Sequence, residues 1–340
     1  MLSKLDKKIL FSLDQDGRKS LSLVAKEVGS SVPVVKYHIE KLLEDGAIKN
    51  FWSFVDYNAL GYDYFWGYWL KFTGANEEKR TEVFDYLQQH THIPIVFRCD
   101  GFADVMIAII AKDLFHHNDI LNNFLGQFDG FIQVKEISIG VSFSKFNRNY
   151  ISDHLTSEKV EISGKKPVSR HNIDTLDKKI ISLTQKNGRI KFTQMADILD
   201  EHPLKIQRHY KKLVSSGIIQ STTYSLSPQK NGVHFFRLLL QIANDKSRVN
   251  DLFTFSKQNP HIIHYIKTIG AYQAMVDIEV FSREMLREII QELYQRFTDL
   301  ILNIEINEIY AIDKFSQMAT EYPDLNERVS LNPWTISGTD

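Results

Sequence analysis

Two stretches of this chain of 340 residues are copies of one another. When residues 5–61 are aligned without a gap with residues 176–232, fourteen positions carry the same residue. Beyond position 61 the identity fades, but the order of predicted helices and strands continues. A tandem duplication of this kind predicts two units of one fold. In the first copy the identical positions are Leu5-Asp6-Lys7-Lys8-Ile9, Gly17-Arg18, Ala25, His38, Lys41-Leu42, Gly46, Ile48 and Gly61.

Each copy begins with a pattern of three short helices. In the first copy the apolar spacing predicts a helix that ends by Gly17, a second that ends at Gly29, and a third that Ser31 caps and Gly46 ends. Residues 48–55 alternate as the two strands of a wing would. Three helices with a tight turn before the third, followed by a wing, are typical of a winged helix-turn-helix.

The rest of each copy reads strand, helix, strand, strand, helix, strand. Two helices on one face of an antiparallel sheet form a ferredoxin-like α+β sandwich, whose open face needs a cover. The sandwich of the other copy is the expected cover. We interpret the aromatic run at 62–69 as packing between the sandwiches, with a stacking site for a flat ligand as the alternative. The expected elements are 62–73, 77–89, 93–98, 105–112, 114–128 and 133–143, then 233–243, 247–258, 262–269, 274–281, 284–297 and 302–312.

The predicted fold class is therefore α+β, with two winged helix-turn-helix domains and two ferredoxin-like (βαββαβ) sandwich domains in tandem. A segment without apolar periodicity separates the copies, and the end of the chain is a patternless tail, for which docking through Trp334 stays open. The expected boundaries are 1–58 for the first helix-turn-helix, 59–150 for its sandwich, 151–172 for a linker, 173–229 for the second helix-turn-helix, 230–316 for its sandwich and 317–340 for the tail.

Composition limits the class of protein and its surroundings. The net charge is −1, but residues 1–50 carry +2 and residues 170–220 carry +5, while 51–150 and 221–340 carry −4 each. A polyanion would thus be attracted to the two helix-turn-helix segments. The single Cys99 excludes an internal disulfide framework and a cysteine-based zinc site. The charged N-terminus and the lack of an apolar run of about 18 residues predict a cytoplasmic protein with no membrane partner.

The outward positions of the third helix decide what it can touch. Arg, Lys and Gln can pair with purine edges in the major groove, and Lys can hold a phosphate. A solvated helix surface is the alternative. The histidine shared by the two copies is interpreted as a packed residue, with a phosphate contact as the second reading. The predicted DNA-binding residues are Ser31, Lys36, Tyr37, His38 and Lys41 in the first copy and Lys205, Gln207, Arg208, His209 and Lys212 in the second.

These motifs resemble the Lrp/AsnC (feast/famine) family of transcription regulators. The resemblance spans about 5–145 and 176–312, and its helix-turn-helix part is the more specific. It implies a DNA-binding regulator whose units pair through their sandwiches. The residues that carry it are Leu5-Asp6-x-x-Ile9, His38-Ile39-Glu40-Lys41-Leu42-x-x-x-Gly46-x-Ile48 and Leu60-Gly61-Tyr62, with Leu176-Asp177, Lys212-Leu213-x-x-x-Gly217-Ile218-Ile219 and Gly232 in the second copy.

The resemblance also implies an effector site. Gly101-Phe102-Ala103-Asp104 is similar to the family's glycine-to-aspartate turn, near which amino-acid effectors bind. The second copy has Gly270 and Gln273 at the same places. The family usually has arginine where this chain has His38 and His209. Family members are single units that dimerise, so this chain resembles a covalently fused dimer whose sandwiches pair within one chain. Further homo-oligomerisation stays open.

Two other functions compete with a ligand-responsive regulator. One is an architectural protein that bends or bridges DNA without a ligand. The other is an enzyme, because siroheme decarboxylases resemble this family in architecture and also occur as fused chains. The sequence contains no catalytic triad, phosphate-binding glycine loop or metal-ligand spacing. We therefore expect neither enzyme activity nor a cofactor or metal. The residues that a decarboxylase would use are His90, His92, Arg98, His261 and His264.

Overall fold

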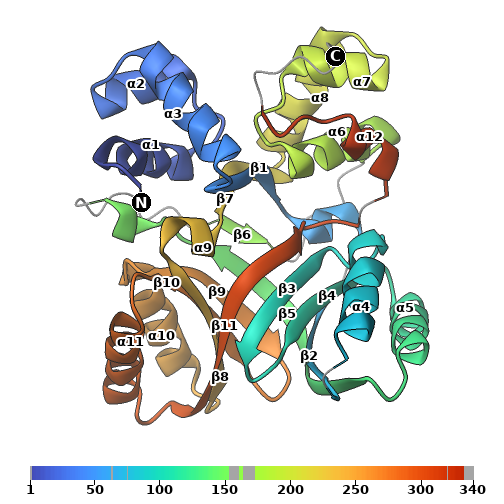
Figure 1. The fold of residues 1–340 in the computed structure, drawn as a ribbon, viewed down its shortest axis with the longest axis vertical. Coiled ribbons are helices and arrows are strands. Elements are labelled where there is room, and N and C mark those ends of the chain that lie inside the picture. Colours follow the sequence, from blue (N-terminus) through green and yellow to red (C-terminus); the bar gives the residue numbers. More distant parts are fainter. Residues whose placement is uncertain are drawn as a thin grey trace.

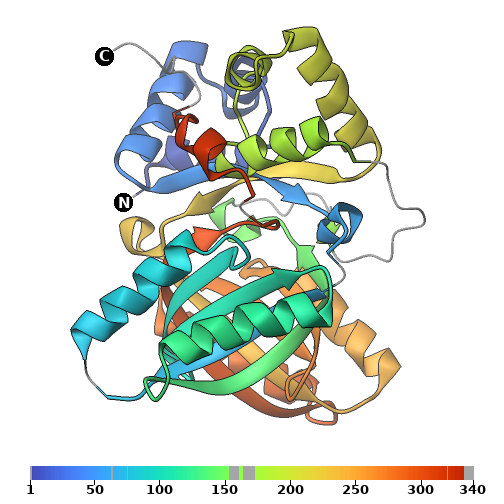
Figure 2. The ribbon, with the colours of Figure 1, turned by 90° about the vertical axis from the view of Figure 1, so that its right-hand side faces the viewer.

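Two helical modules and one barrel make up the molecule. A computed structural model describes residues 2–62, 64–74, 76–152, 161–163, 173–319 and 321–332. The two modules lie on one side of a two-stranded ribbon, and an antiparallel barrel with helices on its outside lies on the other side (Figure 1, Figure 2).

Each module contains three helices, as predicted. Ser3 and Asp174 begin the first helix of each module with a capping box. Gly29 ends the second helix in a left-handed conformation, φ 69°, which a glycine adopts without strain. Ser31 occupies the N-cap of the third helix, but its side chain makes no capping hydrogen bond, contrary to expectation. The helices are α1 (Lys4–Gln15), α2 (Leu21–Val28) and α3 (Val32–Glu44) in the first module and α6 (Thr175–Lys186), α7 (Phe192–Leu199) and α8 (Pro203–Ser215) in the second.

The wing differs from the prediction. Each copy supplies one strand, β1 (Ile48–Val55) or β7 (Ile219–Leu226), and the two strands pair antiparallel with each other. The expected hairpin within one copy was wrong: residues 51–55 and 222–226 are buried between the modules on one face and the barrel on the other, where Trp52 packs on Phe315 and Phe54 on Phe143. Tyr224 of the second copy completes the core of the first module, and Val55 completes that of the second.

Below the ribbon, the two predicted sandwiches share one sheet. Each open face is covered by the other copy, but the sheets also join edge to edge, so that eight strands close into a barrel in the order β2-β4-β3-β11-β8-β10-β9-β5 and back to β2. The closure depends on β5 and β11, whose first halves pair inside their own copy and whose second halves pair with the other copy. The strands are β2 (Tyr64–Phe72), β3 (Ile95–Gly101), β4 (Val105–Ala111), β5 (Ile132–Lys145), β8 (His234–Ile242), β9 (Ile262–Ile269), β10 (Ala274–Val280) and β11 (Ile301–Phe315).

The aromatic run lies on β2 and divides between two cores. Trp69 is fully buried inside the barrel, where it belongs to the same cluster as Phe97 and Leu239. Tyr68 points to the opposite face and packs under the outer helices. This alternation gives β2 an apolar side chain on both faces. The outer helices are α4 (Glu77–Gln89), α5 (Leu114–Gln127), α10 (Lys246–Gln258) and α11 (Arg283–Arg296).

The linker and the tail contain more structure than expected. Within the predicted linker, β6 (Glu161–Ser163) pairs with the end of β5, while residues 153–160 and 164–172 lie outside the described residues. The tail buries Met318 and Val329 against the second module and includes α12 (Pro323–Glu327). Trp334 lies outside the described residues. Short elements connect modules and barrel: η1 (Tyr57–Leu60), η2 (Asn149–Ile151) and α9 (Pro228–Asn231).

Candidate nucleic-acid interface

The third helix of the first module, α3, leaves its outward surface open. Val32, Val34 and Tyr37 are 40%, 39% and 60% exposed, and Lys41 is exposed as well. The Lys36 ammonium lies 3.5 Å from the Glu40 carboxylate one turn later. The helix carries two lysines and two glutamates, so its formal charge is zero. The large exposed side chains of its N-terminal turns are apolar or aromatic, and its cations are balanced by its own glutamates.

The corresponding helix of the second module, α8, is strongly cationic. It carries three lysines, one arginine and no acidic residue, a formal charge of +4. Arg208 and Lys211 are exposed, and Gln207 is half-buried. The ammonium of Lys205 lies 2.6 Å from Glu201, and that of Lys212 lies 2.7 Å from Asp177. Both predicted recognition helices are therefore accessible, but the cations are concentrated on one of them.

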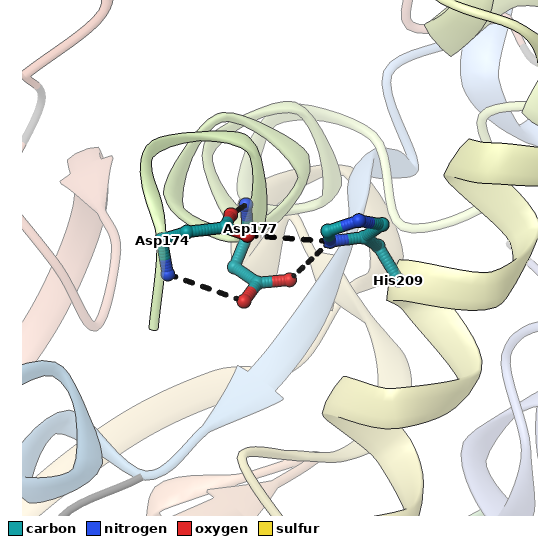
Figure 3. A group of neighbouring side chains, drawn as sticks. All are labelled: Asp174, Asp177 and His209. Atoms are coloured by element: carbon teal, nitrogen blue, oxygen red, sulfur yellow. Dashed lines mark hydrogen bonds and ion pairs between the residues drawn. The ribbon is translucent and has the colours of Figure 1, made fainter. Parts of the chain in front are cut away.

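The shared histidines connect the first and third helices of their modules. The Nδ1 atom of His209 lies 2.8 Å from a carboxylate oxygen of Asp177 (Figure 3). That of His38 lies 2.7 Å from Asp6 in the first module. Asp174 and Asp177 stand close enough to His209 to hold a cation, but capping hydrogen bonds and the Lys212 ammonium occupy their oxygens. We interpret the trio as a helix clamp, since His38 forms the same contact in the first copy.

The Gly-Arg pair that both copies share holds the modules together. Arg18 donates to the carbonyl oxygens of Gly188 and Ile190, at 2.5 and 3.0 Å, and Arg189 donates to those of Gly17 and Lys19. The two glycines are needed because a Cβ on Gly17 would lie 2.8 Å from the Thr222 carbonyl oxygen. Each module is thus hydrogen-bonded to the turn that follows the first helix of the other module. In the sequence, the pair stands out only as an identity between the copies.

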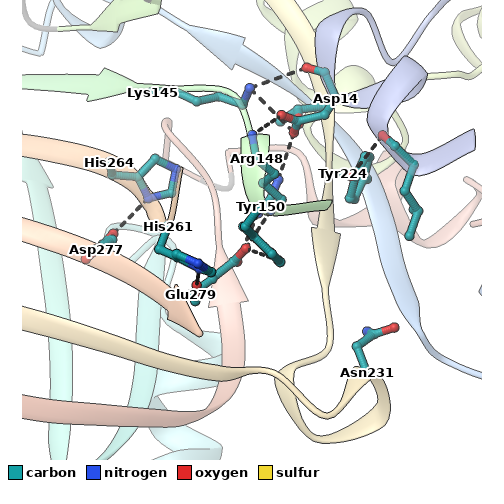
Figure 4. A network of polar contacts seen from close by, with 12 residues as sticks. Asp14, Lys145, Arg148, Tyr150, Tyr224, Asn231, His261, His264, Asp277 and Glu279 are labelled. Carbon is teal, nitrogen blue, oxygen red and sulfur yellow. Dashed lines mark hydrogen bonds and ion pairs between the residues drawn. The ribbon is translucent and has the colours of Figure 1, made fainter. Parts of the chain in front are cut away.

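A buried network of charges connects the first module to the barrel of the second copy (Figure 4). Arg148, at the end of β5, donates to Asp14 of α1 at 2.9 Å and to Glu279 of β10 at 2.9 Å. Lys145 lies 3.7 Å from Asp14, and the Tyr150 hydroxyl donates to Glu279 at 2.6 Å. Although burial raises the pKa of Asp14, the neighbouring Lys145 and Arg148 lower it below its usual value.

The same positions in the other copy are neutral. Gln185 aligns with Asp14 in the sequence, and Gln317 takes the place of Arg148 in the fold. The backbone N–H of Gln317 donates to the side chain of Gln185 at 3.1 Å, just as that of Arg148 donates to Asp14 at 2.7 Å. The molecule therefore has one charged and one neutral connection between modules and barrel.

A second ion pair is buried inside the barrel. Arg237 donates through two nitrogens to Asp277, at 2.6 and 2.7 Å, and His264 lies 2.8 Å from the same carboxylate. Burial raises the pKa of Asp277, but the Arg237 charge and the hydrogen bonds outweigh it and bring the pKa to about 2. Burial lowers the pKa of His264.

This depressed pKa predicts a pH dependence of stability. Ionised Asp277 stabilises the fold above the unfolded pKa of about 3.9, and this contribution should disappear as the pH falls from about 4 to about 2. We expect urea unfolding to show a free-energy gap between the wild type and Asp277→Asn that is full at pH 6 and closes over that range. A gap that stays constant from pH 6 to pH 2 would contradict the assignment, and exposed Asp119→Asn is the control.

The predicted effector turns lie where the two copies meet. A Cβ on Gly101, φ 122°, would lie 2.5 Å from the Ile306 carbonyl oxygen of β11, and one on Gly270, φ 154°, would lie 2.7 Å from the Ile137 carbonyl oxygen of β5. Asp104 accepts the N–H of Phe72 at 2.8 Å, and Gln273 accepts that of Ile242 at 2.9 Å. Gln273 therefore replaces Asp104 in this backbone contact.

A polar groove of about 670 Å³ opens beside the first of these turns. Its wall holds the guanidinium of Arg80, whose Nε atom has no hydrogen-bond partner among the described residues, and that of Arg98, which stacks 3.7 Å above the Phe84 ring. Carboxylate side chains also line this groove. The groove is lined by Phe72, Glu77, Arg80, Thr81, Phe84, Asp85, Arg98, Cys99, Asp100, Asp104, Glu308 and Tyr310.

The residues considered for a decarboxylase do not converge on one site. His264 is bonded to Asp277, whereas His261 stacks on Tyr150 in the charged network. Arg98 lies in the polar groove. His90 and His92 lie at the end of α4 with their rings 6.3 Å apart, and burial, followed by the neighbouring His92 charge, lowers the pKa of His90 to about 4.

Comparisons with known proteins agree with the helix-turn-helix geometry. A family model described as winged helix-turn-helix DNA-binding matches residues 2–49 and 173–220. The HTH-type transcriptional regulator FL11 of Pyrococcus horikoshii is 32% identical over 124 residues, which cover 36% of this chain and 78% of that regulator. The regulator LrpA of the same organism is 29% identical over 136 residues, or 39% of this chain and 93% of LrpA. The chain belongs to the Lrp/AsnC family of transcription regulators. Like other members of that family, it is thus a DNA-binding regulator, here with two units in one chain.

Solved structures of one protein match both units of this Lrp/AsnC chain together. The siroheme decarboxylase NirDL covers 96% of this chain and 96% of its own with a TM-score of 0.60, at 13% sequence identity. This likeness shows that another protein of known structure has the same two-unit fold. No helix in the part of the chain that the structure describes is long and apolar enough to cross a bilayer.

Proposed function

We propose that the chain acts in the cytoplasm as a fused pseudo-dimer, which places α3 and α8 in successive major grooves of one DNA duplex. The observation that carries the proposal is the pair of open recognition helices held on the same side of the β1–β7 ribbon (Figure 2). The arginine contacts between the modules support a fixed distance between the helices. A dimeric helix-turn-helix protein reads two half-sites about one helical turn apart in this way.

Selection of genomic fragments by the full chain, repeated at several salt concentrations, tests the proposal. We expect recovered fragments to share a sequence with two half-sites, and binding to weaken as salt rises, because cations of α8 displace counterions from phosphates. Recovery of random fragments at every salt concentration would overturn sequence-specific regulation. Ligand-independent bending of DNA, measured by circular permutation of the site, would favour the architectural alternative.

The charge difference between the helices predicts unequal effects of two substitutions. Arg208→Ala removes an exposed cation and should weaken binding to a selected site about 5- to 30-fold. Tyr37→Ala removes no charge and should weaken overall affinity less. Titration of labelled duplex at fixed salt gives both numbers, and thermal unfolding checks that both variants fold. Equal losses would show that the charge of α8 does not dominate affinity.

We propose that the polar groove is the effector site and that it takes an amino acid. The Arg80 guanidinium, with its side chain 35% exposed, offers donors to a carboxylate, and Asp100 lines the same groove and suits an ammonium group. Ligand binding should raise the melting temperature of the wild type but not that of Arg80→Ala. Screening the twenty amino acids by thermal shift tests the proposal, and the absence of any shift would count against it.

We also propose that the chain does not act on a tetrapyrrole. The separate positions of the five candidate residues support this. Addition of siroheme to the purified chain should leave its absorption spectrum unchanged. A shifted Soret band would favour the enzyme alternative.

A further inference from the structure

We propose that the two recognition helices read chemically different half-sites: α3 reads the methyl groups of thymines, and α8 holds phosphates and purine edges. This inference rests on the proposed DNA-binding function and adds the kind of base that each helix recognises. It predicts that the preferred site is not a palindrome, although the protein has the pseudo-symmetry of a dimer.

The N-terminal turns of α3 expose large apolar and aromatic side chains. The N-terminal turns of a recognition helix face the base edges, and here they hold Val32, Val34 and Tyr37, each at least 39% exposed. Beside them, Lys36 pairs with Glu40 at 3.5 Å and His38 with Asp6, while the exposed Lys41 lies one turn further along the helix. What α3 offers to a duplex is therefore mainly hydrocarbon and a tyrosine ring.

The two recognition helices differ at several aligned positions. Where α3 has Val34 and Tyr37, α8 has Lys205 and Arg208. Where α3 has Glu40, α8 has Lys211. The two helices occupy equivalent places in equivalent modules, so this difference is not required by the fold. It changes what each helix can bind.

The chemistry of the major groove then selects the partner of α3. The thymine C5-methyl is the apolar group that base pairs present there, and valine or aromatic carbon packs against it. Burying one methyl group is worth about a fourfold gain in affinity. Glu40 and Glu44 make α3 a poor partner for phosphates, whereas Arg208 of α8 can pair with guanine.

The modules cannot exchange their half-sites, because α3 and α8 are fixed to each other through the ribbon and through Arg18 and Arg189. A site with a thymine-rich half and a guanine-containing half would therefore bind in one orientation only. A homodimer, which has two identical helices, has no such polarity.

Selection from a random duplex pool, followed by single thymine-to-deoxyuridine replacements, tests the inference. The replacement removes only the methyl group. We expect it to weaken binding about three- to tenfold per contacted thymine in the α3 half-site and less than twofold in the α8 half-site. Two alike half-sites, or equal sensitivity in both halves, would overturn the inference and leave the proposed function intact. Failure to select any sequence would overturn the proposed function itself.

Two variants test the residues. Val34→Thr with Tyr37→Gln should remove the sensitivity to deoxyuridine and leave the salt dependence unchanged, and persistence of that sensitivity would overturn the assignment to α3. Val34→Lys with Tyr37→Arg gives α3 the side chains of α8 at these positions. That variant should select two similar half-sites. If it still selects the wild-type site, the exposed residues do not determine the difference.

Discussion

Replacement of Arg148 by methionine is expected to lower the free energy of unfolding by about 3–5 kcal/mol. The guanidinium lies between two carboxylates, Asp14 and Glu279, whose side chains are 0% and 7% exposed. Methionine fills a similar volume but leaves both anions buried without their main partner. Urea unfolding at pH 7 measures the loss. A change below about 1 kcal/mol would mean that water or Lys145 compensates for the missing charge.

The chain contains its own control for this variant. Gln317→Met changes the equivalent position of the other copy, where the partners are the neutral Gln185 and the N–H of Val55. We expect a loss of only about 1–2 kcal/mol there, the cost of an unsatisfied neutral group. Asp14→Asn and Glu279→Gln, added to Arg148→Met, should recover at least about 2 kcal/mol because they remove the buried anions.

Replacement of both Arg18 and Arg189 by alanine should loosen the two modules from each other. The variant loses four hydrogen bonds from charged donors to carbonyl groups, and its free energy of unfolding should fall by about 2–4 kcal/mol. Part of the loss is offset, because burial and then the nearby Arg18 charge lower the pKa of Arg189 to about 10.

The same variant should lose its selectivity for half-site spacing. Insertion of five base pairs, half a helical turn, should weaken wild-type binding at least tenfold and variant binding clearly less, because the recognition helices are no longer held at one distance. Lys8→Ala with Lys179→Ala removes the same charge at another repeated pair and is the control. Equal sensitivity to the insertion in all three proteins would show that the arginines do not set the spacing.

The local spacing of apolar residues was enough to predict most of the helices and strands. The three-helix modules follow from apolar spacing with glycine at the helix ends, and the strands and outer helices of the barrel begin and end within a few residues of expectation. The duplication predicted that the copies would cover each other. These features depend on contacts that are close in sequence or repeated at a fixed interval.

Partner choice could not be predicted in the same way. The pairing of β1 with β7 joins segments 171 residues apart, and nothing in residues 48–55 indicates which strand lies beside them. The length of β5 and β11 was underestimated because their second halves pair with the other copy. Whether the tail docks was left open by the sequence for a related reason, since Met318 and Val329 gain their apolar surroundings from the second module.

In the candidate site too, local features could be predicted from the sequence, whereas contacts between distant residues could not. Sequence predicted the exposed helix positions, but not that Lys205 and Lys212 would stand beside carboxylates of their own module. The contact of His38 with Asp6 explains why both residues recur in the second copy, and the identity alone did not distinguish packing from a phosphate contact. Arg148 drew no attention because its two partners lie 134 and 131 residues away.

The shared ribbon also affects how the two copies can change over time. In a dimer of identical chains, every substitution at the interface appears twice and has to suit both sides. Here Asp14 and Arg148 occur once, and the opposite connection has Gln185 and Gln317 instead. Joining the copies removed the requirement for symmetry while β1 and β7 kept the halves dependent on each other. Each half is free to specialise, but neither has a complete core when it is expressed alone.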